Sequence, residues 1–319
     1  MDLEKQEKKP PLLILTGPTA AGKTALSIRL AKAVGGEIVS ADSMQVYRGM
    51  DIGSAKATRE EMAGVPHHLI DVLDPEEDFN VVRFQQLALS AIASIQERGH
   101  LPILAGGTGF YIQSVLYGID FTETREDEGL RNRLEQLAKR EGPEKLHAML
   151  READPEAAAS IHPNNVKRVI RALEFSSSTG SKISDHNRQQ RQKEPVWNSR
   201  YLVLTDSRDA IYERIDRRVD EMIRKGLVEE VAALKGRGLQ RGAVSMQGLG
   251  YKEILAFLDG ECSLEEAVYR IKRDTRHFAK RQLTWFKREK SVIWVDRREF
   301  LDENSILQFL IGQAKEIRT

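Results

Sequence analysis

The sequence predicts an α/β protein in which helices flank a parallel sheet and an all-helical segment is inserted into the chain. Short apolar segments at residues 12–15, 37–40 and 101–105 alternate with amphipathic helical patterns, which is typical of a parallel sheet. From about residue 118 helical patterns continue without a convincing strand, until an apolar segment returns at residues 200–204. We therefore predict a core of residues 11–120 and 199–319 around a helical insertion of residues 121–198.

The first apolar segment leads into a stretch that fits the pattern G-x-x-x-x-G-K-[ST], with a helical pattern directly after it. The stretch consists of Gly17, Pro18, Thr19, Ala20, Ala21, Gly22, Lys23 and Thr24. Backbone N–H groups of such a loop point at a phosphate, and the helix N-terminus adds positive potential. We predict a P-loop NTPase-like fold that binds a polyphosphate, with Lys23 on the terminal phosphate oxygens and the Thr24 hydroxyl on Mg²⁺.

Polar residues follow the next two predicted strands. Asp42 comes after the second strand and Thr108 after the third, so both should lie at the same sheet edge as Lys23. An Asp after a strand is often a turn former or helix cap. It can equally be a carboxylate that faces the phosphate, as a general base or an indirect Mg²⁺ ligand. The pattern alone leaves both interpretations open.

The composition narrows the class of protein. Lys and Arg number 49 against 48 Asp and Glu, so global charge neither favours nor excludes a nucleic-acid partner. The single cysteine, Cys262, excludes an internal disulfide and a Cys-rich zinc module. No apolar run approaches 18 residues and the start lacks an apolar signal region, so we expect a cytoplasmic protein without a membrane span. The neighbours His67 and His68 would point to opposite sides of an extended segment, and we expect a hydrogen-bonded pair and no zinc.

Basic residues gather in two stretches. Residues 167–200 hold eight Lys and Arg against three acidic residues, and residues 270–290 hold nine against two. Such runs are often only solvated helix faces. In a chain of net charge +1 they also indicate a segregated surface, which favours binding to a nucleic-acid backbone.

The second half of the chain should be mainly helical. Apolar residues from about Ala210 to Leu227 recur at helical spacing, another helix should follow Gly250, and a long one should span residues 264–287. A last strand is expected at residues 292–295 before a C-terminal helix. Within the insertion we expect a turn at residues 176–180, and residues 185–194 are nearly all polar.

Taken together, the motifs resemble the tRNA dimethylallyltransferase family, whose members alkylate the adenosine just 3′ of the anticodon. The resemblance covers nearly the whole chain after residue 10. It rests on GPTAAGKT (17–24), ADSMQVYRGMDIGSAK (41–56), VPHHLID (65–71), GGTGFY (106–111), IHPNNVKRVIRALE (161–174), RVDEMIRKGLVEEV (218–231), QGLGYKEI (247–254) and KRDTRHFAKRQLTWF (272–286). Departures are small: Ser54 stands where Thr is usual, Ala57 replaces a frequent Pro, and His277 replaces a frequent Gln.

The resemblance implies a prenyl transfer. The substrate would be dimethylallyl diphosphate, and Lys23, Mg²⁺ at Thr24 and Arg218 would neutralise charge on the departing pyrophosphate. Asp42 would accept the proton of the adenine N6 amino group, and Thr108 would hydrogen-bond near the reacting groups. Because N6 lies on the base-pairing edge, the adenine must be unstacked and turned into the site.

The resemblance also implies a tRNA surface. Residues at the mouth of the site would meet the acceptor: Asp42, Ser43, Met44 and Gln45, with Gln45 able to read adenine. Contacts to the anticodon stem-loop would come from the insertion: Arg131, Lys167, Arg168, Val169, Ile170 and Arg171. We expect salt-sensitive tRNA binding by a monomer.

Three alternatives remain at this point. A small-molecule or nucleoside kinase would use ATP at the same loop, but would leave the basic insertion unexplained. A non-catalytic P-loop binding module would not need Asp42, Gln45 and Thr108 at one edge. A relative that prenylates free adenosine nucleotides would not need a large basic insertion.

Overall fold

The computed structural model describes residues 9–121 and 128–318. The chain divides into two compact units, one formed by Met1–Leu116 with Pro195–Thr319 and the other by Tyr117–Glu194. We call them the core unit and the helical unit, and describe each by itself.

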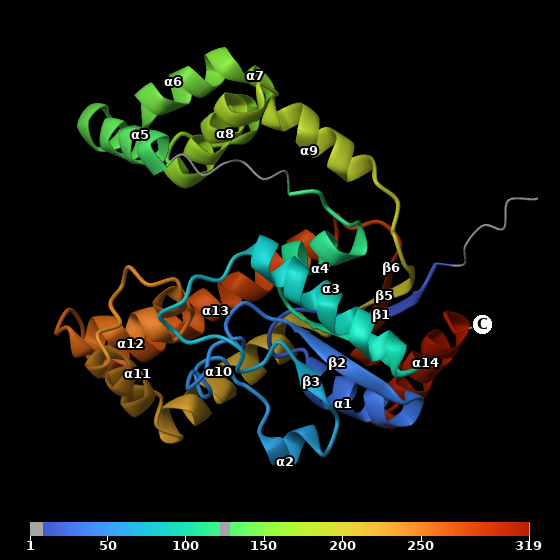
Figure 1. Cartoon of the computed structure of the whole chain (residues 1–319). Coiled ribbons are helices and arrows are strands. Elements are labelled where there is room, and N and C mark those ends of the chain that lie inside the picture. Colours follow the sequence, from blue (N-terminus) through green and yellow to red (C-terminus); the bar gives the residue numbers. More distant parts are fainter. Residues whose placement is uncertain (1–8, 122–127, 319) are drawn as a thin grey trace, which may run out of the picture. The chain divides into compact units, whose positions relative to one another are not determined.

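The core unit contains a six-stranded sheet in the order β3-β2-β4-β1-β5-β6, and every pair of neighbours is parallel (Figure 1). The strands are β1 (Pro11–Thr16), β2 (Gly36–Ala41), β3 (His67–His68), β4 (Leu101–Gly106), β5 (Asn198–Thr205) and β6 (Val292–Asp296). The predicted α/β class and parallel sheet are confirmed. The two-residue strand β3 was not predicted, because it has no apolar run of its own.

Both faces of the sheet are covered. Leu13 and Leu15 of β1 pack in one apolar cluster with side chains of α1 (Lys23–Val34) and α14 (Glu303–Glu316). Neighbouring strand residues point to opposite faces. Ile14, which has no exposed surface, therefore lies on the other face, the one on which α3 (Val81–Glu97) contacts β2 and β4. Double coverage explains why β1 and β4 carry continuous apolar runs that do not alternate with polar residues.

The other core helices include the predicted ones, with one correction at the end of a helix. They are α2 (Arg59–Met62), α4 (Gly109–Leu116), α10 (Arg208–Arg224), α11 (Leu227–Gly236), α12 (Tyr251–Leu258) and α13 (Leu264–Phe286). The helix expected from Ala210 through Leu227 is wrong at its end. Gly226 adopts φ 99°, a left-handed conformation, and separates α10 from α11, so Leu227 begins a new helix.

The helical unit contains no strand among its described residues. Its helices are α5 (Glu128–Glu141), α6 (Pro143–Ala153), α7 (Pro155–Ser160), α8 (Val166–Thr179) and α9 (Ile183–Gln192). The expected turn at residues 176–180 is instead the last turn of α8, which Gly180 caps in a left-handed conformation. The nearly all-polar segment is largely the helix α9.

Buried Asp154 joins two helices of this unit. It caps α7 by accepting the Ala157 N–H at 3.0 Å, and it accepts the Ser184 N–H and hydroxyl from α9 at 2.9 and 2.7 Å. A carboxylate without exposed surface needs such partners. Asp154, a buried acidic residue of the helical unit, therefore has a structural role.

The compact helical unit spans residues 117–194, against the predicted insertion of 121–198. Residues after 194 belong with the sheet, because the Val196 N–H donates to Leu116 O at 3.0 Å and Asn198 pairs in register with Pro11. Among the described residues, no helix is both long and apolar enough to cross a membrane.

Candidate active site

The loop between β1 and α1 directs two of its carbonyl groups at the side chain of Lys23. Lys23 Nζ donates to the carbonyls of Gly17 at 3.0 Å and Pro18 at 2.8 Å. Gly17 has φ 147°, and a Cβ there would come within 2.3 Å of Leu204 O. Only glycine allows this approach, which brings the loop against β5. The motif therefore has the strand–loop–helix context that phosphate binding requires.

Two cations and a carboxylate meet beside this loop. Burial, and then the charge of Arg218 on α10, lower the pKa of Lys23 from 10.5 to about 8, while Asp42 opposes the shift. Burial also lowers the pKa of Arg218, and Asp42 raises it. Arg218 Nη1 lies 3.5 Å from Thr19 Oγ1. Lys23, Asp42 and Arg218 lie far apart in the sequence, but the fold places them near enough for the charge of each to act on the others.

Asp42 forms a turn directly after β2. Its Oδ1 accepts the N–H of Met44 at 2.8 Å and that of Gln45 at 3.4 Å. The turn-forming interpretation is therefore correct, and it does not exclude the other one. The side chain is partly exposed, and its second oxygen accepts no hydrogen bond from the described residues. That oxygen is available to a ligand.

Thr108 is fixed beside Asp42 through the backbone. The Thr108 N–H donates to Ala41 O at 3.1 Å, and its carbonyl accepts the N–H groups of Tyr111 and Ile112 in the first turn of α4. At Gly106 a Cβ would lie 2.3 Å from Ala41 O, so the ends of β2 and β4 approach closely. The predicted placement of both residues at one sheet edge is confirmed.

The remaining residues predicted at the mouth follow Asp42. The Gln45 amide is held at both ends: Oε1 accepts the Ser40 hydroxyl at 3.1 Å, and Nε2 donates to Ser54 O at 3.4 Å. Ser43 and Met44 are partly exposed. Because a primary amide has two N–H groups and an oxygen with two lone pairs, each end of the Gln45 amide keeps one further position with which to read a base.

Four residues that support the loop were missed. Gln282 of α13 accepts the Thr19 N–H at 2.8 Å and donates to Gly107 O at 2.9 Å. Arg214 Nε donates to Ala20 O at 2.8 Å, and Arg297 Nη1 to Ala21 O at 3.2 Å. Asp206 accepts Arg214 at 2.9 Å. Gln282 lies in one of the quoted motifs, but no local spacing pointed to its partner.

A family model described as IPP transferase matches residues 45–289, more than half of the 319 residues. The chain belongs to the IPP transferase family. A tRNA dimethylallyltransferase of Lachnoclostridium phytofermentans is 59% identical over 301 residues, covering 94% of this chain and 96% of the relative. That of Bacillus subtilis is 51% identical over 288 residues, covering 90% and 91%.

Solved structures agree with this placement. The tRNA isopentenylpyrophosphate transferase of Bacillus halodurans superposes with a TM-score of 0.72 at 46% identity, covering 97% of this chain and 98% of that one. A eukaryotic dimethylallyltransferase acting on tRNA superposes with a TM-score of 0.82 at 30% identity, covering 94% and 78%. The family assignment therefore holds for sequence and fold together.

The helical unit of this IPP transferase carries the other residues predicted to bind tRNA. Lys167, Arg168 and Arg171 are exposed on α8. Val169 and Ile170 are instead 0% and 4% exposed, in the apolar core of the unit. Their side chains hold α8 in place, so a tRNA-binding role for this stretch can rest only on the three basic side chains.

Arg131, the remaining predicted tRNA contact, makes a bidentate ion pair within the helical unit. Its Nε and Nη2 each donate to a Glu174 oxygen at 2.9 Å, which joins α5 to α8. A phosphate that contacts Arg131 must share or displace this carboxylate.

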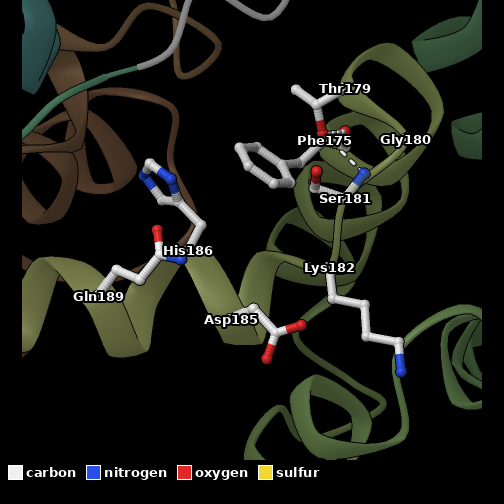
Figure 2. Close-up of a pocket in the computed structure, with 8 residues that line it drawn as sticks. All are labelled: Phe175, Thr179, Gly180, Ser181, Lys182, Asp185, His186 and Gln189. Carbon is white, nitrogen blue, oxygen red and sulfur yellow. Dashed lines mark hydrogen bonds between the residues drawn. The ribbon is translucent and has the colours of Figure 1, made fainter.

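A polar hollow of about 550 Å³ lies where α8 gives way to α9 (Figure 2). The rings of Phe175 and His186, both drawn in Figure 2, line it in tilted contact with their centroids 5.1 Å apart. Lys182 and Asp185 line it as well. None of these residues was assigned to the site by the sequence.

The residues at the phosphate loop fit magnesium in one particular mode. The described part of the chain holds no group of three or more His, Cys, Asp or Glu side chains that could hold a metal ion. Mg²⁺ retains several waters and is commonly bound by one or two protein oxygens together with substrate phosphates. The exposed Thr24 at the start of α1 and the free oxygen of Asp42 match that mode.

The two neighbouring histidines are hydrogen-bonded, as expected, but to different partners. His67 Nδ1 lies 2.8 Å from Val65 O, and His68 Nε2 lies 2.7 Å from Glu37. The His68 ring therefore joins β3 to β2, whereas the His67 ring bonds within the segment that leads into β3.

Proposed function

We propose that this IPP transferase transfers a dimethylallyl group from dimethylallyl diphosphate to N6 of the adenosine on the 3′ side of the anticodon in tRNA, and releases pyrophosphate. The observation that carries the proposal is that the phosphate loop, with Lys23 inside it and Arg218 3.5 Å from its Thr19, lies at the same sheet edge as Asp42. Two cations suit a departing diphosphate, and a carboxylate suits a departing proton. The names of the relatives, tRNA dimethylallyltransferase, support the same reaction.

The phosphate loop would hold the leaving group. As the allylic carbon–oxygen bond breaks, its electron pair stays on the diphosphate oxygen, and Lys23 and Arg218 stabilise that charge. Mg²⁺, held by Thr24, would supply further positive charge to the diphosphate when bound. Such fixed charges act strongly because they need no rearrangement during the reaction.

Asp42 would act on the acceptor. The N6 electron pair forms the new carbon–nitrogen bond, and the N6 proton passes to the free oxygen of Asp42. The other oxygen keeps the turn at Met44 and Gln45, which fixes the carboxylate. Because N6 is reachable only outside the base stack, the adenine must be extruded.

The acceptor would be a macromolecule bound in part through Lys167, Arg168 and Arg171. Their exposed charges on α8 suit phosphates of an anticodon stem-loop. We further propose that the enzyme acts as a cytoplasmic monomer.

The reaction itself can be tested directly. Purified protein with Mg²⁺ and dimethylallyl diphosphate should release one pyrophosphate per prenylated tRNA, as measured by phosphate analysis and by mass spectrometry of tRNA nucleosides. Turnover of ATP on a small metabolite, with such tRNA left unmodified, would establish the kinase alternative.

Asp42 can be separated into its two roles. Asp42→Asn keeps an oxygen that accepts the Met44 and Gln45 N–H groups but cannot take a proton, whereas Asp42→Ala loses both functions. We expect Asp42→Asn to retain tRNA and pyrophosphate binding while turnover falls by about 10²- to 10⁴-fold. Retained turnover in Asp42→Asn, with loss only in Asp42→Ala, would make the residue purely structural.

A further inference from the structure

Glu230, on α11, uses its whole carboxylate within the core unit. Oε2 accepts the N–H groups of Asp51 at 2.9 Å and Ile52 at 2.8 Å. Oε1 accepts the Gly53 N–H at 3.1 Å and the Tyr251 hydroxyl at 2.7 Å. An ionised carboxylate has about four acceptor positions, so none remains for a substrate. Glu230 can influence a reaction only through what it holds.

Among the described residues, no group other than Glu230 accepts these three N–H groups. Residues 51–53 lie outside every helix and strand, and three successive N–H groups converge on one carboxylate. Converging N–H groups of this kind bind anions in other proteins. At Gly53 a Cβ would come within 2.6 Å of the Tyr251 ring, so only glycine lets the segment approach α12.

This segment is connected to the acceptor side of the site. Ser54, the next residue, accepts the Gln45 side-chain amide on its carbonyl and donates its hydroxyl to Met50 O at 2.6 Å. Met44 packs so closely on Gly248 that a Cβ there would lie 2.5 Å from its methyl carbon. The loop of residues 42–54 is therefore held at its start by Asp42 and at its end by Glu230.

We propose that Glu230, with Tyr251, is a positioning residue that sets the loop of residues 42–54 for the acceptor and touches neither substrate. The inference rests on the proposed function, because it assigns the loop to tRNA. The phosphate loop is held by other residues, Gln282, Arg214 and Arg297, and none of their hydrogen bonds within the described part of the chain reaches residues 51–53. Loss of Glu230 should therefore affect the acceptor and spare the diphosphate.

The experiment compares Glu230→Ala, Glu230→Gln and Tyr251→Phe with the wild type, in steady-state transfer to tRNA and in pyrophosphate binding. Glu230→Gln keeps one carbonyl for the N–H groups and can donate its amide to the Tyr251 hydroxyl. We expect kcat/KM for tRNA to fall about 10- to 100-fold in Glu230→Ala and less in the other two, because small displacements of reacting groups are costly. The pyrophosphate Kd should stay within about twofold in all three.

Glu37→Gln is the matched control, since it neutralises a carboxylate with several partners elsewhere in the core unit. If the Glu230 and Tyr251 variants lose activity only in proportion to their unfolded fraction, as the control should, Glu230 is structural and the inference is wrong. An equal loss of pyrophosphate affinity also overturns it. A wild type that leaves tRNA unmodified would overturn the proposed function itself, before any variant is compared.

Discussion

The pKa of Lys23 is lowered in the folded protein, and a bound diphosphate would raise it again. Burial and the charge of Arg218 bring its pKa from 10.5 to about 8. Because the pKa in the folded protein lies below the unfolded value, the charged lysine opposes folding at neutral pH, and this cost disappears as pH rises from 8 to 10.5. A bound diphosphate would give the Lys23 ammonium a negatively charged partner, in addition to the neutral carbonyls of Gly17 and Pro18.

Pyrophosphate affinity should therefore fall as pH rises above about 8, approaching tenfold per pH unit, because the loop loses its lysine charge. Lys23→Arg should not show this component, since guanidinium stays protonated. Calorimetric titration of both proteins between about pH 7 and 9.5 checks this, and the ligand's own ionisation affects both equally. Parallel pH profiles for the two proteins would contradict the predicted role of Lys23.

For single residues, the sequence predicts a role where the partners of the residue lie close to it along the chain. The lysine and the threonine of the loop follow from one eight-residue motif, and Asp42 from its place after a strand. Gln282 could not be found in this way, because its partner Thr19 lies 263 residues away. Glu230 and Asp51 are separated by 179 residues. Hydrogen bonds of this kind depend on the packed fold, which local spacing does not encode.

Among the elements, α8 shows what a motif by itself cannot separate. The family resemblance assigns the stretch of residues 167–171 to tRNA as a whole. Its helix places Val169 in the core with 0% exposure and leaves Lys167, Arg168 and Arg171 in solvent. Helical periodicity would have divided the stretch, because residues that share a face recur every three or four positions.

Reversing one charge on this face tests its role. Arg168→Glu should weaken tRNA binding and reduce the slope of log K against log salt by about 0.7 to 0.9 for each phosphate that the protein no longer neutralises. Arg151→Glu is the control, since Arg151 is an exposed arginine on α6 of the same unit. Binding isotherms at several salt concentrations give both slopes. Equal slopes for the two variants would remove α8 from the interface.

On the scale of the whole molecule, the parallel sheet and the helical insertion follow from the alternation of patterns along the chain. The order of the strands does not, because β4 inserts between β1 and β2 only when long-range pairs form. Because the strands are parallel, the predicted catalytic residues gather at one edge of the sheet. Asp42 and Thr108 lie past the carboxyl ends of β2 and β4, whereas Glu37 lies near the amino end of β2.

At that opposite edge, Glu37 contacts one arginine and two histidines. Its carboxylate is 3% exposed and contacts Arg98 and His68 at 2.7 Å and His100 at 2.6 Å. These groups, the Arg98 hydrogen bond first, lower its pKa from 4.5 to about 2 against the effect of burial. Because the pKa in the folded protein is depressed, the stabilisation is present above pH 4.5 and is lost as pH falls towards 2.

Glu37→Gln should therefore lower the free energy of unfolding at pH 7 by about 2 to 3 kcal/mol, and the difference from wild type should shrink as pH falls below 4.5. Urea unfolding followed by tryptophan fluorescence measures this in the core unit, because Trp197, Trp285 and Trp294 all belong to it. Activity per folded molecule should not change, since Glu37 lies at the edge away from Asp42. A difference of the same size at about pH 3 and pH 7 would show that the carboxylate stabilises the sheet by its shape and not by its charge.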